Sequence, residues 1–144
     1  MSDTQRVIRT VAAVIVNAVI LDDQQRVLVV RKHGSSTFIQ PGGKRDPGED
    51  SLTTLARELD EELGVALDAG SARRLGEFQA AAVNEAGFTV SGEAFLVSVS
   101  GEPLAAAEIA ELAWIPIDPP VDFPLAPLSR QHILPAARRL LGQP

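Results

Sequence analysis

Residues 43–65 read GKRDPGEDSLTTLARELDEELGV, and this stretch decides the fold. Its second half predicts a helix from Ser51 to Leu63, because apolar residues recur there at the three- and four-residue spacing of one helical face. That apolar stripe consists of Leu52, Leu55, Ala56, Leu59 and Leu63. Asp50 or Ser51 can cap the start of the helix, and Gly64 supplies the left-handed residue that ends it. The residues before the helix are rich in Pro and Gly and predict a loop.

The same stretch concentrates negative charge. It holds seven acids and three bases, so 3 − 7 = −4 of the net charge of −6 lies within it. At about 100° of rotation per residue, Glu61, Glu58 and Glu62 fall roughly 180°, 240° and 280° from Leu52, on a flank away from the core. Like charges at this spacing cost about 0.2–0.5 kcal/mol per pair, so folding alone gives no reason to gather them. A bound cation would give one, and a solvated acidic face is the alternative.

The residue types favour a hard divalent cation. The chain has no cysteine and two histidines, so thiolate and imidazole ligands are scarce. Ligands that are all oxygen suit Mg²⁺, with Mn²⁺ as an alternative. The Gly42-Gly43 pair can bring backbone carbonyls close to the carboxylates. Arg57 lies next to Glu58 and one turn before Glu61, where it can fix carboxylate geometry and balance charge.

The pattern of residues 43–65 resembles the signature of the Nudix hydrolases. That signature reads G, five residues, E, seven residues, R-E, an apolar residue, any residue, E-E, any residue, G and an apolar residue. All nine specified positions match. The flanking strand order and the entering Pro41-Gly42-Gly43 resemble the family more loosely. The resemblance implies an α/β/α sandwich with a mixed β-sheet that hydrolyses a nucleoside diphosphate linked to another group.

The resemblance also implies roles for individual residues. The implied metal ligands are Glu58, Glu61, Glu62 and the Gly42 carbonyl. Glu58 would also be a candidate base for the attacking water. Arg57 and Glu49 would be orienting residues that pair with one another or with Glu58. A diphosphate brings concentrated negative charge to an acidic site, which metal ions bridging the two make tolerable.

An acid outside the motif is expected to join the site. Glu108 and Glu111 precede Trp114 in a segment that resembles the family's segment before its last strand, where an acid can reach the metal or act as base. We take Glu111 as the catalytic candidate. Surface glutamates beside a core Trp114 are the alternative for each.

Three residues are candidates for substrate binding: Phe38, Arg31 and Lys44. Phe38 either stacks on a nucleobase or fills the core. Arg31, like its neighbour Lys32, either meets phosphate or is solvated at a strand end. His33 and His132 are expected at the surface.

The rest of the chain predicts strands interleaved with two helices, which is typical of an α/β fold. Apolar runs predict a hairpin at the centre of a sheet from Val11–Leu21 and Arg26–Lys32, and a second hairpin from Arg74–Val83 and Phe88–Val99. Leu104–Leu112 is ambiguous between helix and strand. The other expected elements are an extended piece at Phe38–Gln40, a loop at Pro41–Gly48, a strand at Leu112–Ile117 and a helix at Ser129–Leu141 that Pro135 kinks or divides.

Length and composition limit the function classes. A chain of 144 residues predicts one domain, residues 1–144. The net charge of −6 and pI near 4.8 argue against a duplex nucleic-acid partner. The apolar run Val11–Leu21 is too short to cross a bilayer, so we read it as a buried strand of a cytoplasmic protein with no membrane partner. A small-molecule nucleotide is the expected substrate, and the sequence is compatible with a homodimer.

Substrate class is reached by elimination within the family. The chain has no tyrosine, which the dinucleoside polyphosphate hydrolases carry beyond the motif, and Ala80-Ala81-Ala82 lacks the proline of ADP-ribose hydrolases. No NADH-type or coenzyme-A-type motif is present, and the absence of cysteine argues against the isopentenyl diphosphate isomerases. The chain is most similar to the MutT-type nucleoside triphosphate pyrophosphohydrolases, which clear 8-oxo-dGTP and related nucleotides. The alternative is a non-catalytic module that binds a nucleotide, against which the intact motif argues.

Overall fold

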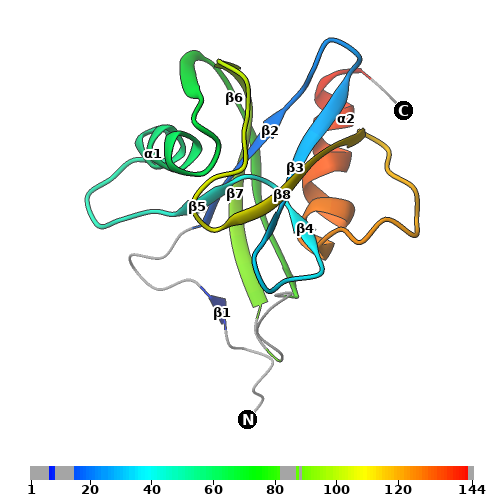
Figure 1. Ribbon diagram of the computed structural model, residues 1–144. Helices are drawn as coiled ribbons and strands as arrows, with labels where there is room; N and C mark the ends of the chain where they lie inside the picture. The colour runs from blue at the N-terminus through cyan, green and yellow to red at the C-terminus, as the bar shows by residue number, and fades with distance from the viewer. Residues whose placement is uncertain (1–6, 9–14, 82–86, 88, 143–144) are drawn as a thin grey trace.

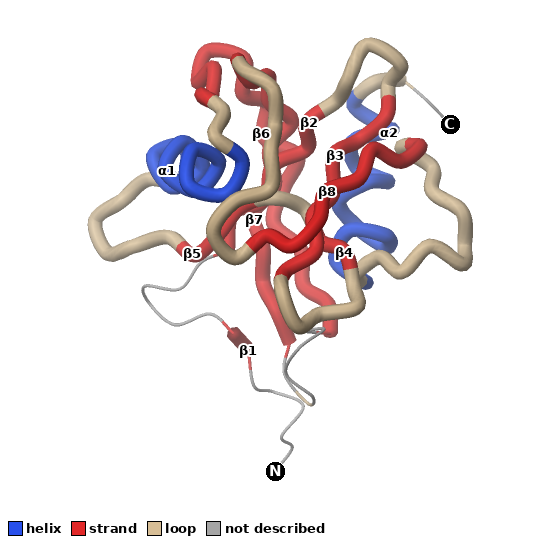
Figure 2. Tube along the Cα trace, viewed as in Figure 1, coloured by secondary structure: helices blue, strands red, loops and turns tan. Residues whose placement is uncertain are grey.

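A computed structural model describes residues 7–8, 15–81, 87 and 89–142 (Figure 1, Figure 2). Among the described residues, strands precede and follow the first helix, and the other two helical segments come last. In order they are β1 (Val7–Ile8), β2 (Ile15–Ile20), β3 (Arg26–Lys32), β4 (Phe38–Ile39), β5 (Gly42–Lys44), α1 (Ser51–Leu63), β6 (Ala66–Ala81), β7 (Thr89–Ser100), β8 (Ile109–Pro116), the π-helical turn η2 (Leu128–Ile133) and α2 (Leu134–Leu140).

The strands form two sheets. In the first, β1, β7, β2 and β5 lie side by side, and β6 pairs with β7. This sheet is mixed, because β2 runs parallel to β7 and antiparallel to β5. In the second, β3 lies between β4 and β8 and is antiparallel to both.

The expected hairpin of β2 and β3 is wrong. The two strands share only the isolated bridge between Leu21 and Val27 and then diverge into different sheets. The turn itself is present: Asp22 accepts hydrogen bonds from the main-chain N–H of Gln24 and of Arg26. The strands separate because each already has two other neighbours, β7 and β5 for β2, and β4 and β8 for β3. Residues 11–14 of the expected first strand lie outside the described residues.

β2 and β3 are buried on both faces, which explains their nearly continuous apolar sequences. On one face, alternate residues pack against the leucines of α1: Ala18, Ile20, Leu28 and Val30. On the other face, the intervening residues pack against η2 and α2: Val19, Val27 and Val29. Figure 1 shows α1 and α2 on opposite sides of the strands. The expected α/β/α sandwich is therefore confirmed.

Helix α1 has the predicted bounds and caps. The Asp50 carboxylate accepts a hydrogen bond of 2.8 Å from the main-chain N–H of Thr53. Gly64 ends the helix with φ of 67°, in the left-handed region that favours glycine. Of the apolar stripe, Leu55, Leu59 and Leu63 are fully buried. The stripe fixes which face of α1 meets the sheet, and therefore which residues flank it.

Other elements differ from expectation mainly at their bounds. The second hairpin is confirmed as β6 and β7, but β6 begins at Ala66 rather than Arg74. The ambiguous segment becomes strand from Ile109 onward, in β8. The last helix is divided, since η2 gives way to α2 at Leu134, directly before Pro135. The expected loop at Pro41–Gly48 is wrong in part, because Gly42–Lys44 form β5 and pair with β2. No helix among the described residues is long and apolar enough to span a membrane.

Candidate active site

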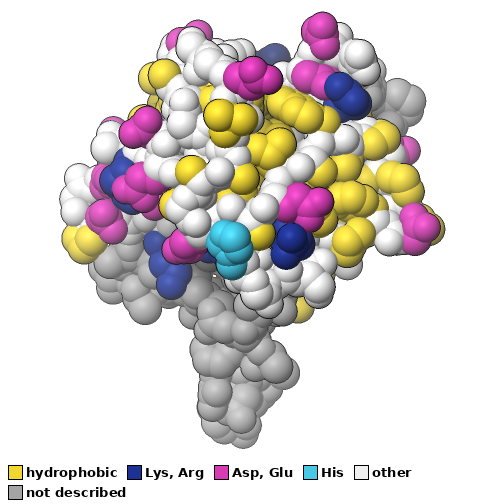
Figure 3. All heavy atoms as spheres, viewed as in Figure 1, with side chains coloured by type: hydrophobic (Ala, Val, Ile, Leu, Met, Phe, Trp, Pro, Cys, Tyr) yellow, Lys and Arg dark blue, Asp and Glu magenta, His cyan; other side chains and the backbone are white. Residues whose placement is uncertain are grey.

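A cavity of about 440 Å³ opens where α1, β5 and the start of β8 meet. Its walls come from segments distant in sequence, and they carry most of the acids and bases singled out above. The described residues that line it are Asn17, Lys32, Ile39, Gln40, Gly42, Gly43, Lys44, Asp46, Arg57, Glu58, Glu62 and Glu108. Charged side chains of both signs mix on the α1 side of the molecule in Figure 3.

Arg57 holds two carboxylates in place. Its Nε and one terminal nitrogen donate to the two oxygens of Glu49, at 2.9 and 2.8 Å. Its other terminal nitrogen donates to Glu58 at 2.6 Å. The Arg57 guanidinium, with help from the Thr54 hydroxyl and the Asp46 N–H, lowers the pKa of Glu49 to about 2. The pairing that the family resemblance implies for these residues is present, and it fixes the Glu58 carboxylate at the cavity wall.

Glu62 is buried, contrary to the expectation that it lies on a flank away from the core. Only 6% of its surface is exposed, and its Oε1 has no hydrogen-bond partner among the described residues. Burial and the nearby charge of Glu58 raise the pKa of Glu62 to about 7, although the main-chain N–H of Gly42 donates to it. A buried, under-bonded carboxylate is costly unless a positive group compensates it.

The backbone of β5 lies directly against Glu58. A Cβ atom placed on Gly43 would overlap the Glu58 side chain, with the Glu58 Cδ atom as its nearest neighbour. The absence of a side chain at Gly43 therefore leaves room for the Glu58 carboxylate, and no unusual backbone angle is involved. This contact holds the strand backbone and the Glu58 carboxylate together at the cavity wall.

Strand alternation separates the two acids that precede Trp114. Glu111 lies opposite Arg31 in the pairing of β3 with β8, and their side chains form an ion pair of 3.0 Å. Glu108 pairs instead with Lys32, at 3.5 Å, and both line the cavity. Glu111 and Arg31 are not among the lining residues, because Arg31 and Lys32 are neighbours on β3 and point to opposite faces. The structure therefore brings Glu108, and not Glu111, to the other site residues.

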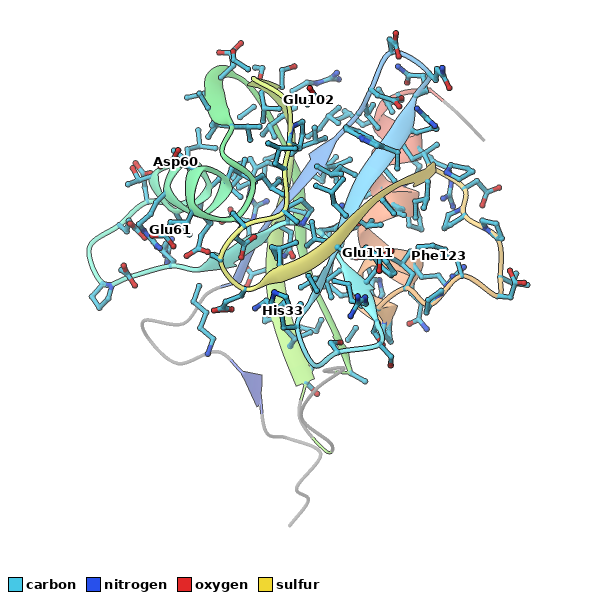
Figure 4. All side chains as sticks on the ribbon, in the orientation of Figure 1. His33, Asp60, Glu61, Glu102, Glu111 and Phe123 are labelled. Carbon is cyan, nitrogen blue, oxygen red and sulfur yellow. The ribbon has the colours of Figure 1, made fainter. Side chains whose placement is uncertain are left out.

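Of the remaining predicted site residues, some line the cavity and others do not. Gly42 and Lys44 line the cavity. Phe38 does not: it is buried in the core, with its ring 5.1 Å from that of Phe123. Glu61 is exposed on α1 and does not line the cavity. Figure 4 shows Glu61 on α1, far from Glu111, which lies on the side of Phe123.

Three uncharged lining residues were not anticipated: Asn17, Ile39 and Gln40. Asn17 interrupts an apolar run, and Gln40 follows two apolar residues just before Pro41. A polar residue inside a buried strand needs a partner, and that signal alone could have marked both positions.

Comparison with known proteins settles the family. A family model described as NUDIX domain matches residues 11–136, which is most of the chain. The chain belongs to the Nudix family. As a Nudix hydrolase it is an enzyme, a pyrophosphohydrolase that acts on phosphoanhydride bonds. The reading as a non-catalytic module is thereby set aside. A comparison with curated proteins gave no match.

Solved structures agree with this assignment. The E. coli ORF135 protein has 26% sequence identity and a TM-score of 0.73, over 94% of this chain and 91% of that one. A putative nudix hydrolase family member from Chromobacterium violaceum has 26% identity and a TM-score of 0.72, over 94% and 84%. A MutT NUDIX hydrolase from Burkholderia pseudomallei has 25% identity and a TM-score of 0.69, over 84% and 97%. Each is a Nudix-type fold to which this chain is similar over most of its length.

Nudix hydrolases use divalent metal ions, and the cavity fits one. Among the described residues, no three His, Cys, Asp or Glu side chains are grouped closely enough to hold an ion by themselves. The buried Glu62 Oε1, without a partner, supplies an oxygen for such an ion. The donor set of carboxylate and backbone oxygens suits a hard cation.

Gly43→Ala is expected to separate folding from catalysis in this Nudix hydrolase. The added methyl group would displace the flexible end of Glu58 and not a backbone, so stability should change little. Turnover should fall by about 10²-fold, because Glu58, the candidate base, would be displaced. Gly70→Ala is the matched control, since its nearest neighbour would be an ordinary contact at 3.5 Å. Steady-state kinetics and chemical denaturation of both variants check this, and equal activities would contradict it.

Glu62→Gln is expected to stabilise the metal-free protein or leave it unchanged. The wild-type carboxyl, with its raised pKa, costs stability as the pH rises from 4.5 through about 7, since a buried charge then replaces a neutral group. Mg²⁺ at about ten times its Kd should stabilise the wild type by about 1.4 kcal/mol at pH 8, and the variant should lose most of that gain.

The same melts test Glu61, whose role as a ligand remains a prediction. Glu61→Gln should also lose the magnesium gain, whereas Asp60→Asn, an exposed control on the same helix turn, should keep it. Thermal melts in EDTA, MgCl₂ and NaCl of matched ionic strength distinguish these cases. Equal magnesium shifts in all four proteins would mean that neither glutamate is an important ligand.

Proposed function

We propose that this Nudix hydrolase is a Mg²⁺-dependent nucleoside triphosphate pyrophosphohydrolase, with Mn²⁺ as an alternative ion. The observation that carries the proposal is the buried Glu62 carboxylate, without a partner for Oε1, in one cavity with Glu58 and Glu108. Water would add across a phosphoanhydride bond to give a nucleoside monophosphate and pyrophosphate. The MutT-named neighbour at 25% identity supports the substrate class, which includes 8-oxo-dGTP and related nucleotides.

The chain's own residues divide the chemistry among them. Glu58, Glu61, Glu62 and the Gly42 carbonyl are the residues proposed to hold the ion. When bound, the ion would acidify the attacking water and stabilise the charge of the leaving phosphate. Glu58 is the first candidate to accept the proton of that water. Arg57, itself held by Glu49, keeps the Glu58 carboxylate oriented.

Cationic side chains at the cavity are placed to meet phosphate. Lys44 lines the cavity and makes no ion pair with any described residue, so its ammonium is available to a substrate. Lys32 is engaged with Glu108 at 3.5 Å. Phosphate oxygens arriving near Lys32 would compete with that acid, which leaves Glu108 free to accept a proton.

Further proposals concern the chain as a whole. We propose that residues 1–144 make one domain and that the protein works in the cytoplasm on small nucleotides, without duplex nucleic acid. The acidic net charge of −6 supports the last point. A homodimer is compatible with this reading.

Hydrolysis is expected to require a divalent cation and to prefer nucleoside triphosphates over diadenosine polyphosphates and ADP-ribose. Release of pyrophosphate or phosphate from a nucleotide panel, in MgCl₂, MnCl₂ or EDTA, measures this. Glu58→Gln and Glu62→Gln should each lower the rate by at least about 10²-fold, since each loses a charge at the ion while keeping its shape. Activity in EDTA would refute the metal dependence. A higher specificity constant for ADP-ribose than for every triphosphate would refute the substrate class.

Glu108→Gln is expected to lower kcat, and Glu111→Gln to leave it unchanged. The two variants are matched controls for one another, because each loses one ion pair with a base of β3. Only Glu108 lines the cavity. The pH profile of kcat should lose its acidic limb in Glu108→Gln if that carboxylate accepts the proton. If Glu111→Gln alone lowers kcat, the sequence-based choice of Glu111 stands.

A further inference from the structure

Gln40 has a buried side-chain amide, of which only the nitrogen has a hydrogen-bond partner among the described residues. Its side chain is 2% exposed and lines the cavity. The Nε2 group donates a buried hydrogen bond of 3.1 Å to the carbonyl of Ala18, which fixes the orientation of the amide, since a flipped amide would oppose two acceptors. The Oε1 atom has no partner among the described residues. A buried acceptor of this kind is expected to meet a donor in the working protein.

A second amide lies beside it. Asn17 directly precedes Ala18, is 6% exposed and lines the same cavity. Its Nδ2 group donates to the main-chain carbonyl of Glu93 at 3.3 Å. Apart from glycines, Asn17, Ile39 and Gln40 are the uncharged members of the described lining. This part of the wall therefore combines two side-chain amides, of which Gln40 has an unpartnered acceptor, with one apolar side chain.

The chemistry of this wall differs from that of the acidic part. Phosphate and carboxylate oxygens are acceptors and cannot satisfy Gln40 Oε1. A nucleobase can, because it carries ring N–H or exocyclic amino donors at its edge and an apolar face that suits Ile39. A site with a buried acceptor discriminates strongly between ligands with and without a hydrogen-bond donor, since a ligand that lacks the donor leaves the acceptor unpaired.

We propose that Gln40 is a specificity-determining residue whose Oε1 accepts a hydrogen bond from an N–H or amino group of the substrate's nucleobase. The inference rests on the proposed function, which makes the substrate a nucleotide. It adds that the nucleobase is the part of the nucleotide that Gln40 recognises. It makes the cavity selective for bases with a donor edge, with guanine, which has both a ring N–H and an amino group, as the fullest match.

Binding of nucleoside monophosphates to the wild-type protein with Mg²⁺, measured by titration calorimetry, tests the proposal without turnover. The probes are GMP, AMP and purine riboside monophosphate, whose base has neither a ring N–H nor an amino donor. We expect the better of GMP and AMP to bind at least about ten-fold more tightly than purine riboside monophosphate. All three carry the same ribose hydroxyls, so a hydroxyl donor would leave their affinities alike. Equal affinities, or no measurable binding of any probe, would overturn the proposal.

Gln40→Met tests the residue itself. It keeps the approximate shape but removes the acceptor, so the difference between donor-bearing and donor-free bases should disappear. A purely structural role, through the bond to Ala18, would instead weaken all three probes equally. Gln79→Met, at an exposed position of β6, is the matched control and should leave the three affinities unchanged. Should Gln40→Met fail to fold, the wild-type comparison alone decides.

The binding measurements and the hydrolysis assay test different proposals, and each can fail without the other. Base-dependent binding without triphosphate hydrolysis would remove the proposed substrate class and keep the role of Gln40. Triphosphate hydrolysis with equal binding of all three monophosphates would keep the function and remove this role.

Discussion

The contact of β5 with α1 is the constraint on which the active site depends. β5 is fixed to the sheet by pairing Gly42 with Asn17 and Gly43 with Val16. The helix is fixed to the same sheet by its buried leucines, which pack on β2. Because both elements are held by β2, the Glu58 side chain lies directly against Gly43, and a larger residue there would have to displace it. The carboxylates, the strand backbone and the two wall amides are thereby set at fixed positions by one strand.

Local sequence predicted the helix well, since its determinants are local. Caps at Asp50 and Gly64 and the leucine stripe act within the helix itself, and the family motif is a run of neighbouring residues. The burial of Glu62 could not be predicted from local sequence. A helical wheel places it about 80° from the leucine stripe, and whether that flank faces water depends on what lies over it. Here β5 lies over it, and the main-chain N–H of Gly42 donates to the carboxylate.

The features that sequence reasoning missed depend on pairing between strands that are distant in sequence. Glu108 and Glu111 look equivalent in sequence, and only the register of β3 against β8, with an irregularity between Arg31 and Lys32, assigns one to the cavity. The hairpin of β2 and β3 was expected because adjacent apolar strands often pair. Instead, β2 pairs with β7 and β3 pairs with β8, and both of these partners are distant in sequence. Such pairings are set by the whole fold and leave little local signal.

The charge of the cavity differs from the charge of the motif, and the difference bears on how a polyphosphate enters. The motif sums to −4, but among the described lining residues four acids face three bases, so 3 − 4 = −1 with every group ionised. Most of these charged groups already form ion pairs. Arg57 pairs with Glu49 and Glu58, and Lys32 pairs with Glu108. A metal-free cavity therefore offers a polyphosphate little net attraction. One divalent cation would change the sum to +1, so the ion would contribute to substrate binding as well as to chemistry, and binding of metal and substrate should be coupled.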